Sequence, residues 1–377
     1  GYTASDFDGV LFEVQAAQSS TTFTIKMPSV ESGSGTTNNG TLDTKPYYKV
    51  GPLQQAFGFG WGTGTWNAST WGTARTTSNA VLDPGSWSLD NFGELLIATI
   101  KNGQSFSWDP NTGVTTRATI ISNAPTRSVM SMVSDRDRHL IILGTETTIG
   151  NTATQDKLFI RFSDQESLTD YNPTSINTAG SFRIDSGTKI VGAAKAKDYV
   201  LILTDTSAYL MQFVGPPFTF SIRQVGSNCG CIGQHGIVYA NGAVYWMSDS
   251  GGFFIFDGTV KSLGSLVEDF VFSTNDSAPG FNFANGSELT FGGHNSLYSE
   301  ITWFYASASS NVVDRFVTYN YAEQTWTTGS LARTTYEDKH VFPDPIATEF
   351  VSSLAPNVPT IQGVSNGASR VFNHETG

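Results

Sequence analysis

The stretch from residue 197 to 258 repeats one local pattern twice, and this repeat constrains the fold more than any other feature of the chain. The first copy reads YVLIL, a polar turn TDTS, then AYLMQF, and the second reads AVYWM, SDSGG, then FFIF. Short runs rich in β-branched and aromatic residues, separated by Gly, Asp and Ser, are typical of antiparallel β-hairpins. No helical period is visible in either copy, so the pattern predicts antiparallel sheet.

The same pattern recurs along the chain at a spacing that suits the blades of a propeller. Strands of this kind begin near Leu95, Leu140, Val200, Val244 and Ile301, which places them 45, 60, 44 and 57 residues apart. A module of roughly 40–60 residues holds a four-stranded antiparallel sheet, and closing such sheets into a ring leaves few bare strand edges. We therefore predict an all-β chain, a β-propeller of antiparallel blades with a small N-terminal β insertion. One or two β-sandwich domains are the alternative.

Local composition divides the chain into three parts. Residues 1–46 hold two short alternating strands and then a run of Gly, Ser, Thr and Asn, which predicts part of an inserted β-domain with a long exposed loop. Residues 47–340 are the predicted propeller body. Residues 341–377 are predicted to be an irregular connection that begins a further blade or a C-terminal extension.

The charge balance limits the classes of function. The formal net charge is −12 and the pI is about 4.8, so the surface is expected to repel a phosphate backbone, which argues against a groove-reading DNA-binding protein. No uninterrupted apolar stretch approaches the roughly 20 residues that a membrane-spanning helix needs.

The search for reactive groups predicts no catalytic residue, no cofactor and no metal site. Cys229 and Cys231 are too close in sequence for an unstrained disulfide, and with His235 they still fall short of the four ligands of a structural zinc. We predict that both are reduced, packed thiols. His139 is likewise predicted to be a packed or surface histidine, because no catalytic partner for it is identifiable.

An enzyme remains the alternative in the form of a secreted β-propeller glycosidase, which needs two carboxylates that face each other across a sugar cleft. The candidate carboxylates are Asp135, Asp164, Asp205 and Asp249. All four lie in predicted turns, where aspartate also has a structural role. A carbohydrate-binding module is a second alternative.

The segment VGPPF at 214–218 is the candidate for a contact with another subunit. Two consecutive prolines place a rigid apolar corner between two predicted strands. Such a corner either caps the core or docks a neighbouring subunit. Pro216, Pro217 and Phe218 are therefore the candidate interface residues.

Several segments, taken in order, resemble one family of phage proteins. They are GFGWGTGTW at 58–66, WSLDNFGELLI at 87–97, IRFSDQESLTDYNPTSINTAG at 160–180, LILTDTSAYLMQFVGPPFTF at 201–220, CGCIG at 229–233 and YWMSDSGGFFIFDG at 245–258. As a set they resemble the tail hub, or tail nozzle, of short-tailed bacteriophages, also called the packaged-DNA stabilisation protein. The resemblance covers about residues 47–340.

This resemblance implies a structural protein of the virion tail with a β-propeller body. Such proteins assemble as a ring, usually a homo-hexamer, below the portal and the tail adaptor protein, where they extend the DNA exit channel and retain packaged DNA. They carry fibres, spikes or a needle, and duplex DNA passes through the lumen without sequence-specific binding. An acidic lumen would pass a duplex by charge repulsion. The family pattern begins before residue 1 and continues past residue 377, so we expect either a chain that is incomplete at both ends or a ring that closes differently.

Overall fold

The computed structural model describes residues 86–351, apart from 114–115, 274–279, 284–285, 311 and 341, together with short strands on either side of this range. Within the N-terminal part these are β1 (Val10–Leu11), β2 (Val14–Ala17) and β3 (Phe23–Ile25), followed by β4 (Gln55–Ala56) and β5 (Leu82–Asp83). The predicted Gly/Ser/Thr-rich loop and the segment at 58–66 lie outside the described residues.

Five four-stranded antiparallel sheets, here called blades 1 to 5, follow one another along the chain, each with its strands in sequence order. Blade 1 holds β6 (Trp87–Phe92), β7 (Leu95–Ile100), β8 (Ser105–Trp108) and β9 (Thr119–Ile120), and blade 2 holds β10 (Met130–Val133), β11 (Leu140–Leu143), β12 (Phe159–Phe162) and β13 (Gly180–Arg183). Blade 3 holds β14 (Ile190–Lys195), β15 (Val200–Thr204), β16 (Ser207–Gly215) and β17 (Thr219–Ser227). Blade 4 holds β18 (Ile237–Ala240), β19 (Ala243–Ser248), β20 (Gly252–Phe256) and β21 (Val260–Leu263), and blade 5 holds β22 (Phe291–Asn295), β23 (Glu300–Tyr305), β24 (Arg315–Asn320) and β25 (Thr325–Ser330).

A sixth sheet of three strands follows blade 5. It contains β26 (Thr335–Glu337), β27 (Ile346–Val351) and β29 (Ala368–Asn373), while β28 (Thr360–Ile361) pairs with β1 in parallel. Two one-turn helices, α1 (Glu268–Val271) and α2 (Gly286–Leu289), lie between blades 4 and 5 in sequence.

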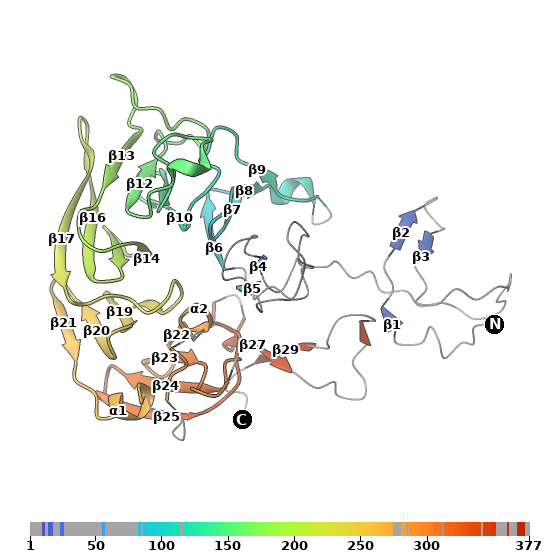
Figure 1. Cartoon of the computed structure of the whole chain (residues 1–377), viewed down its shortest axis with the longest axis vertical. Helices are drawn as coiled ribbons and strands as arrows, with labels where there is room; N and C mark the ends of the chain where they lie inside the picture. Colours follow the sequence, from blue (N-terminus) through green and yellow to red (C-terminus); the bar gives the residue numbers. More distant parts are fainter. Residues whose placement is uncertain are drawn as a thin grey trace, which may run out of the picture.

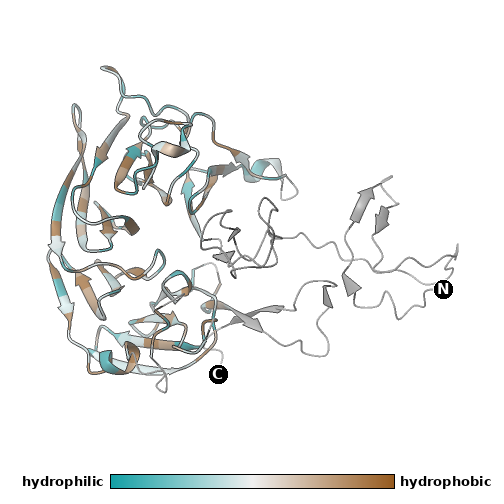
Figure 2. Cartoon of the chain, viewed as in Figure 1, coloured by the Kyte–Doolittle hydropathy of each residue, from teal (hydrophilic) through white to brown (hydrophobic). Residues whose placement is uncertain are grey.

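The sheets stand around a common centre, with the first strand of each blade innermost and the last strand outermost (Figure 1). Five hydrophobic clusters fill the spaces between consecutive sheets, and each draws its side chains from two neighbours only. Figure 2 shows these hydrophobic residues along the strands. The prediction of a β-propeller is therefore confirmed, and the two-layer β-sandwich alternative is wrong.

The strands that the sequence repeat picks out are the second strand of each blade. β15, with the sequence VLILT, is buried at all five positions, and β19 is buried at all six. A second strand has a sheet neighbour on both edges and another blade against each face, so it carries a continuous apolar run instead of an alternating pattern.

Two ion pairs join parts of the propeller that are not adjacent in sequence. At the end of β14, the ammonium of Lys195 lies 2.9 Å from Asp90 Oδ1 on β6, which joins blade 3 to blade 1. Lys101 from the turn after β7 forms an ion pair with Glu288 on α2. These ion pairs therefore join elements that are not neighbours in the ring of sheets.

Candidate subunit interface and neighbouring polar groups

The candidate interface residues lie at the tip of the longest hairpin of the described chain. β16 and β17 have nine residues each, whereas every other strand in the described part has six or fewer. Their turn contains Pro216 and Pro217, joined by a cis peptide bond, and it follows Gly215, whose φ of +81° favours glycine. Phe218 is 76% exposed, so its ring does not cap the core.

The base of this hairpin is fixed by aromatic packing. Phe220 on β17 is 3% exposed, and its ring lies 4.9 Å from that of Phe162 in blade 2 and 5.6 Å from that of Phe213 on β16. Phe162 and Phe220 belong to the cluster between blades 2 and 3, and Phe213 packs against it. The tip thus extends from a base that is packed into the core.

A second protrusion stands beside the hairpin. The loop at 163–179 joins β12 to β13, and its Ile176 is 95% exposed. Thr219 Oγ1, at the tip of the hairpin, donates a hydrogen bond of 3.0 Å to the carbonyl of Thr178 in this loop. Figure 1 shows both protrusions along the same outer edge. We call Ile176, Val214 and Phe218, all of them exposed large hydrophobic residues, the tip residues.

A buried polar network holds the 163–179 loop in place. His139 is fully buried; its Nδ1 lies against the carboxylate of Asp137, and its Nε2 lies 2.9 Å from Thr178 Oγ1. Thr178 in turn donates from both its hydroxyl and its backbone N–H to Asp164 Oδ1, at 2.6 and 2.8 Å. His139 is therefore a packed histidine, as predicted, and it connects blade 2 to the base of the loop.

We expect the replacement Asp164→Asn to weaken this network and to make the stability of the folded protein less dependent on pH in the acidic range. Burial raises the pKa of Asp164, but hydrogen bonds from Thr178 and Gln165 and the charge of His139 lower it by more, so the net shift is downward. A carboxylate whose pKa is lower in the folded state stabilises the protein above its unfolded pKa of about 3.9, and this stability is lost as pH falls through the folded pKa.

The variant is therefore expected to lose about 1 kcal/mol of unfolding free energy at pH 7, a figure that allows for partial solvent screening of this half-buried group. Urea unfolding at pH 7 and at pH 3 measures both effects, because the difference between variant and wild type is expected to shrink at the lower pH. Asp198→Asn, in an exposed turn, is the matched control. An equal loss in both variants contradicts the role given to Asp164.

The structure separates the four candidate carboxylates into one close pair and two engaged groups. Asp164 belongs to the network above, and Asp135 Oδ1 lies 2.8 Å from the ammonium of Lys195. Asp205 and Asp249 line one small cavity of about 190 Å³ at the turns of blades 3 and 4. Sequence alone did not pair these two residues.

The environments of Asp205 and Asp249 drive their pKa values apart. Burial raises the pKa of Asp249, and the charge of Asp205 raises it further. Burial also acts to raise the pKa of Asp205, but hydrogen bonds from the hydroxyl and backbone N–H of Thr188 outweigh it and lower the pKa. A difference of this kind between two carboxylates is also found in catalytic acid–base pairs. Here, however, both carboxylate oxygens of Asp205 already accept hydrogen bonds from Thr188.

The two cysteines agree with the prediction of packed thiols. Both are free and buried, and burial raises the pKa of Cys229 to about 11 and that of Cys231 to about 12. Thiols with such pKa values are poor nucleophiles at neutral pH. In the part of the chain that the structure describes, no three His, Cys, Asp or Glu side chains are grouped to hold a metal ion. The described helices include none that is long and apolar enough to cross a membrane.

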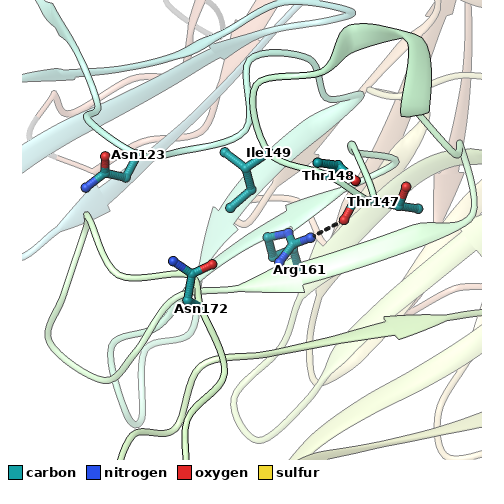
Figure 3. Close-up of a pocket in the computed structure, with 6 residues that line it drawn as sticks. All are labelled: Asn123, Thr147, Thr148, Ile149, Arg161 and Asn172. Carbon is teal, nitrogen blue, oxygen red and sulfur yellow. Dashed lines mark hydrogen bonds between the residues drawn. The ribbon is translucent and has the colours of Figure 1, made fainter.

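One cavity was not predicted from the sequence. It measures about 480 Å³ and is lined by Asn123, Thr147, Thr148, Ile149, Arg161 and Asn172 (Figure 3). The feature of the sequence that could have indicated this cavity is Arg161, an arginine within the apolar strand FIRF of β12. A charged residue at such a position is exceptional unless it is paired.

Comparison with known proteins gives distant structural likenesses only. No family model matches the chain, and no curated protein sequence matches it. Among solved structures, BamB from Moraxella catarrhalis is similar at 13% identity over 78% of this chain and 73% of that one, with a TM-score of 0.41. Sqt1 from Saccharomyces cerevisiae is similar at 8% identity over 71% of this chain and 81% of that one, also with a TM-score of 0.41.

Proposed function

We propose that this chain is a structural protein of the tail of a short-tailed bacteriophage, where copies of it form a ring that extends the DNA exit channel. The ring lies below the portal and the tail adaptor protein, retains packaged DNA and anchors fibres, spikes or a needle. The observation that carries the proposal is the ordered set of segments between residues 58 and 258 that resemble the tail hub, or nozzle, family.

Three features of the molecule support this proposal. The resemblance implies a propeller body, and the chain is a propeller. A ring-forming subunit also needs apolar groups at its outer edge, and the tip residues are exposed large hydrophobic side chains. The net charge of −12 suits a lumen that lets a duplex pass without holding it.

The glycosidase alternative rests on Asp205 and Asp249 alone. Their cavity of about 190 Å³ is smaller than the roughly 300–1,000 Å³ of common small-molecule sites. Asp205 also accepts a hydrogen bond from Thr188. This geometry favours a structural role for Asp205 in its turn over a role as a catalytic nucleophile. These observations support the structural role over a glycosidase.

We expect the purified protein to form a six-fold ring with an open centre. Native mass spectrometry measures the number of 40.6 kDa chains in each particle, and electron-microscope class averages give the symmetry and the width of the opening. An assay with aryl glycosides, run on the same sample, is expected to show no turnover. A monomer that hydrolyses glycans would overturn the proposal and would direct attention to Asp249.

A further inference from the structure

The cavity of about 480 Å³ beside blade 2 combines one charge with neutral hydrogen-bonding groups. Arg161 comes from β12, Thr147, Thr148 and Ile149 from the loop between β11 and β12, and Asn172 from the 163–179 loop. Asn123 reaches it from the segment that links blades 1 and 2. Figure 3 shows Arg161 between Asn172 and Thr147. The volume lies within the range of sites for small molecules.

Arg161 carries a buried positive charge that the chain neutralises only in part. Arg161 is 6% exposed, and no carboxylate of the described chain lies within ion-pair distance of its guanidinium. Glu146 is nearby and interacts with it electrostatically, but the carboxylate of Glu146 accepts hydrogen bonds from Thr126 and Gly150. A buried cation without a paired anion is costly, so such groups are kept where something else compensates them.

The guanidinium retains donors that the protein does not use. Nη1 donates to the carbonyl of Tyr171 at 3.3 Å, and Nη2 donates to the carbonyls of Glu146 and Thr147 at 3.4 and 2.8 Å. Within the described chain, Nε has no hydrogen-bond partner although it is buried. Burial lowers the pKa of Arg161 and the charge of Glu146 opposes this change, but an arginine starts so far above neutral pH that it stays charged.

The rim of the cavity adds neutral polar groups suited to hydroxyls. Asn123 and Asn172 are exposed, and their side-chain amides make no hydrogen bond within the part of the chain that is described. An amide both donates and accepts, as a sugar hydroxyl requires. A guanidinium, in contrast, matches the planar geometry of a carboxylate.

From this arrangement we infer that the cavity binds a small carboxylate-bearing ligand of the size of an acidic monosaccharide, with the carboxylate on Arg161 and the hydroxyls on the two asparagines. This site is separate from the tip residues, and its binding does not depend on whether the subunits form a ring.

Isothermal titration of the whole protein with D-glucuronate and with N-acetylneuraminate tests the inference. At least one acid is expected to bind saturably with a millimolar or tighter Kd, whereas the neutral sugar D-glucose is expected not to bind. Arg161→Met is expected to weaken binding at least about tenfold, because a charge-assisted hydrogen bond to a carboxylate is lost. The matched control is Arg183→Met, which removes a charge from the neighbouring strand β13 but lies outside the cavity.

A second variant keeps the test decisive if Arg161→Met fails to fold. Asn172→Ala changes only an exposed rim residue, so it is expected to keep the wild-type melting temperature and to bind the acid more weakly. Absence of saturable binding by both acids overturns the inference. Equal binding of D-glucose, or unchanged affinity in Asn172→Ala and in a folded Arg161→Met, overturns it as well. Inorganic phosphate is the third arm, and binding of phosphate without either acid contradicts the assignment to a carboxylate.

Discussion

Replacing Phe218 by aspartate is expected to convert the proposed ring of subunits into monomers that remain folded. Phe218 is 76% exposed in the single subunit and stands at the tip of the β16–β17 hairpin. In the proposed ring, Phe218 is buried against a neighbouring subunit. An aspartate at that position would bury a charge without a partner. Central aromatic residues of interfaces contribute at least about 2 kcal/mol each, so the subunit affinity is expected to fall about 30-fold or more.

Size-exclusion chromatography with light scattering measures this loss, and circular dichroism checks that the fold is kept. Leu266→Asp is the matched control, because Leu266 is fully exposed and precedes α1 at the opposite end of the molecule from the hairpin tip (Figure 1). A ring that survives Phe218→Asp removes the hairpin tip from the interface. Dissociation by both variants to the same extent would indicate a general effect of added charge.

Trp303→Ala is expected to lower the free energy of unfolding by about 3–5 kcal/mol, the range for truncating a large buried aromatic residue. Trp303 on β23 is fully buried between blades 4 and 5, where its ring lies 5.0 Å from that of Phe253. Its indole Nε1 donates a 3.0 Å hydrogen bond to the carbonyl of Gly236. The variant therefore leaves a cavity and also removes one of the two hydrogen bonds that the Gly236 carbonyl accepts, the other coming from the backbone N–H of Met247.

Urea denaturation followed by circular dichroism measures the change. Trp87→Ala provides the comparison, because Trp87 is 42% exposed and belongs to a blade as Trp303 does. Its truncation is expected to cost less than half as much. Similar losses in the two variants would mean that the packing between blades 4 and 5 contributes less than the burial of Trp303 implies.

The propeller was predictable because the second strands of blades 2, 3 and 4 have no exposed face. Leu140, Val200 and Val244 each lie in a second strand, which is covered on both faces and therefore stands out as an apolar run. The innermost strands gave a weaker signal. β6 alternates Ser and Asp with apolar residues, since its side chains make polar contacts with blades 2 and 3.

The candidate site was predictable only where the signal was local. The corner at Pro216 and Pro217 is visible in sequence because proline restricts the backbone wherever it occurs. The approach of the 163–179 loop to this corner depends on a hydrogen bond between Thr219 and Thr178, 41 residues apart. The pairing of Asp205 with Asp249 likewise arises from the stacking of blades 3 and 4, which no single strand encodes.

The ion pairs between non-adjacent parts of the propeller have a consequence for any conduit built from this protein. Because Lys195 pairs with Asp90 and Lys101 pairs with Glu288, side chains tie the sheets of one propeller together, so we expect a passage wide enough for a double helix to lie between subunits and not within one. The bore of that passage then follows from how many copies stand around it and from the angle at which neighbours meet. A change in the outer loops alone would widen or narrow it, while each propeller kept the same interior.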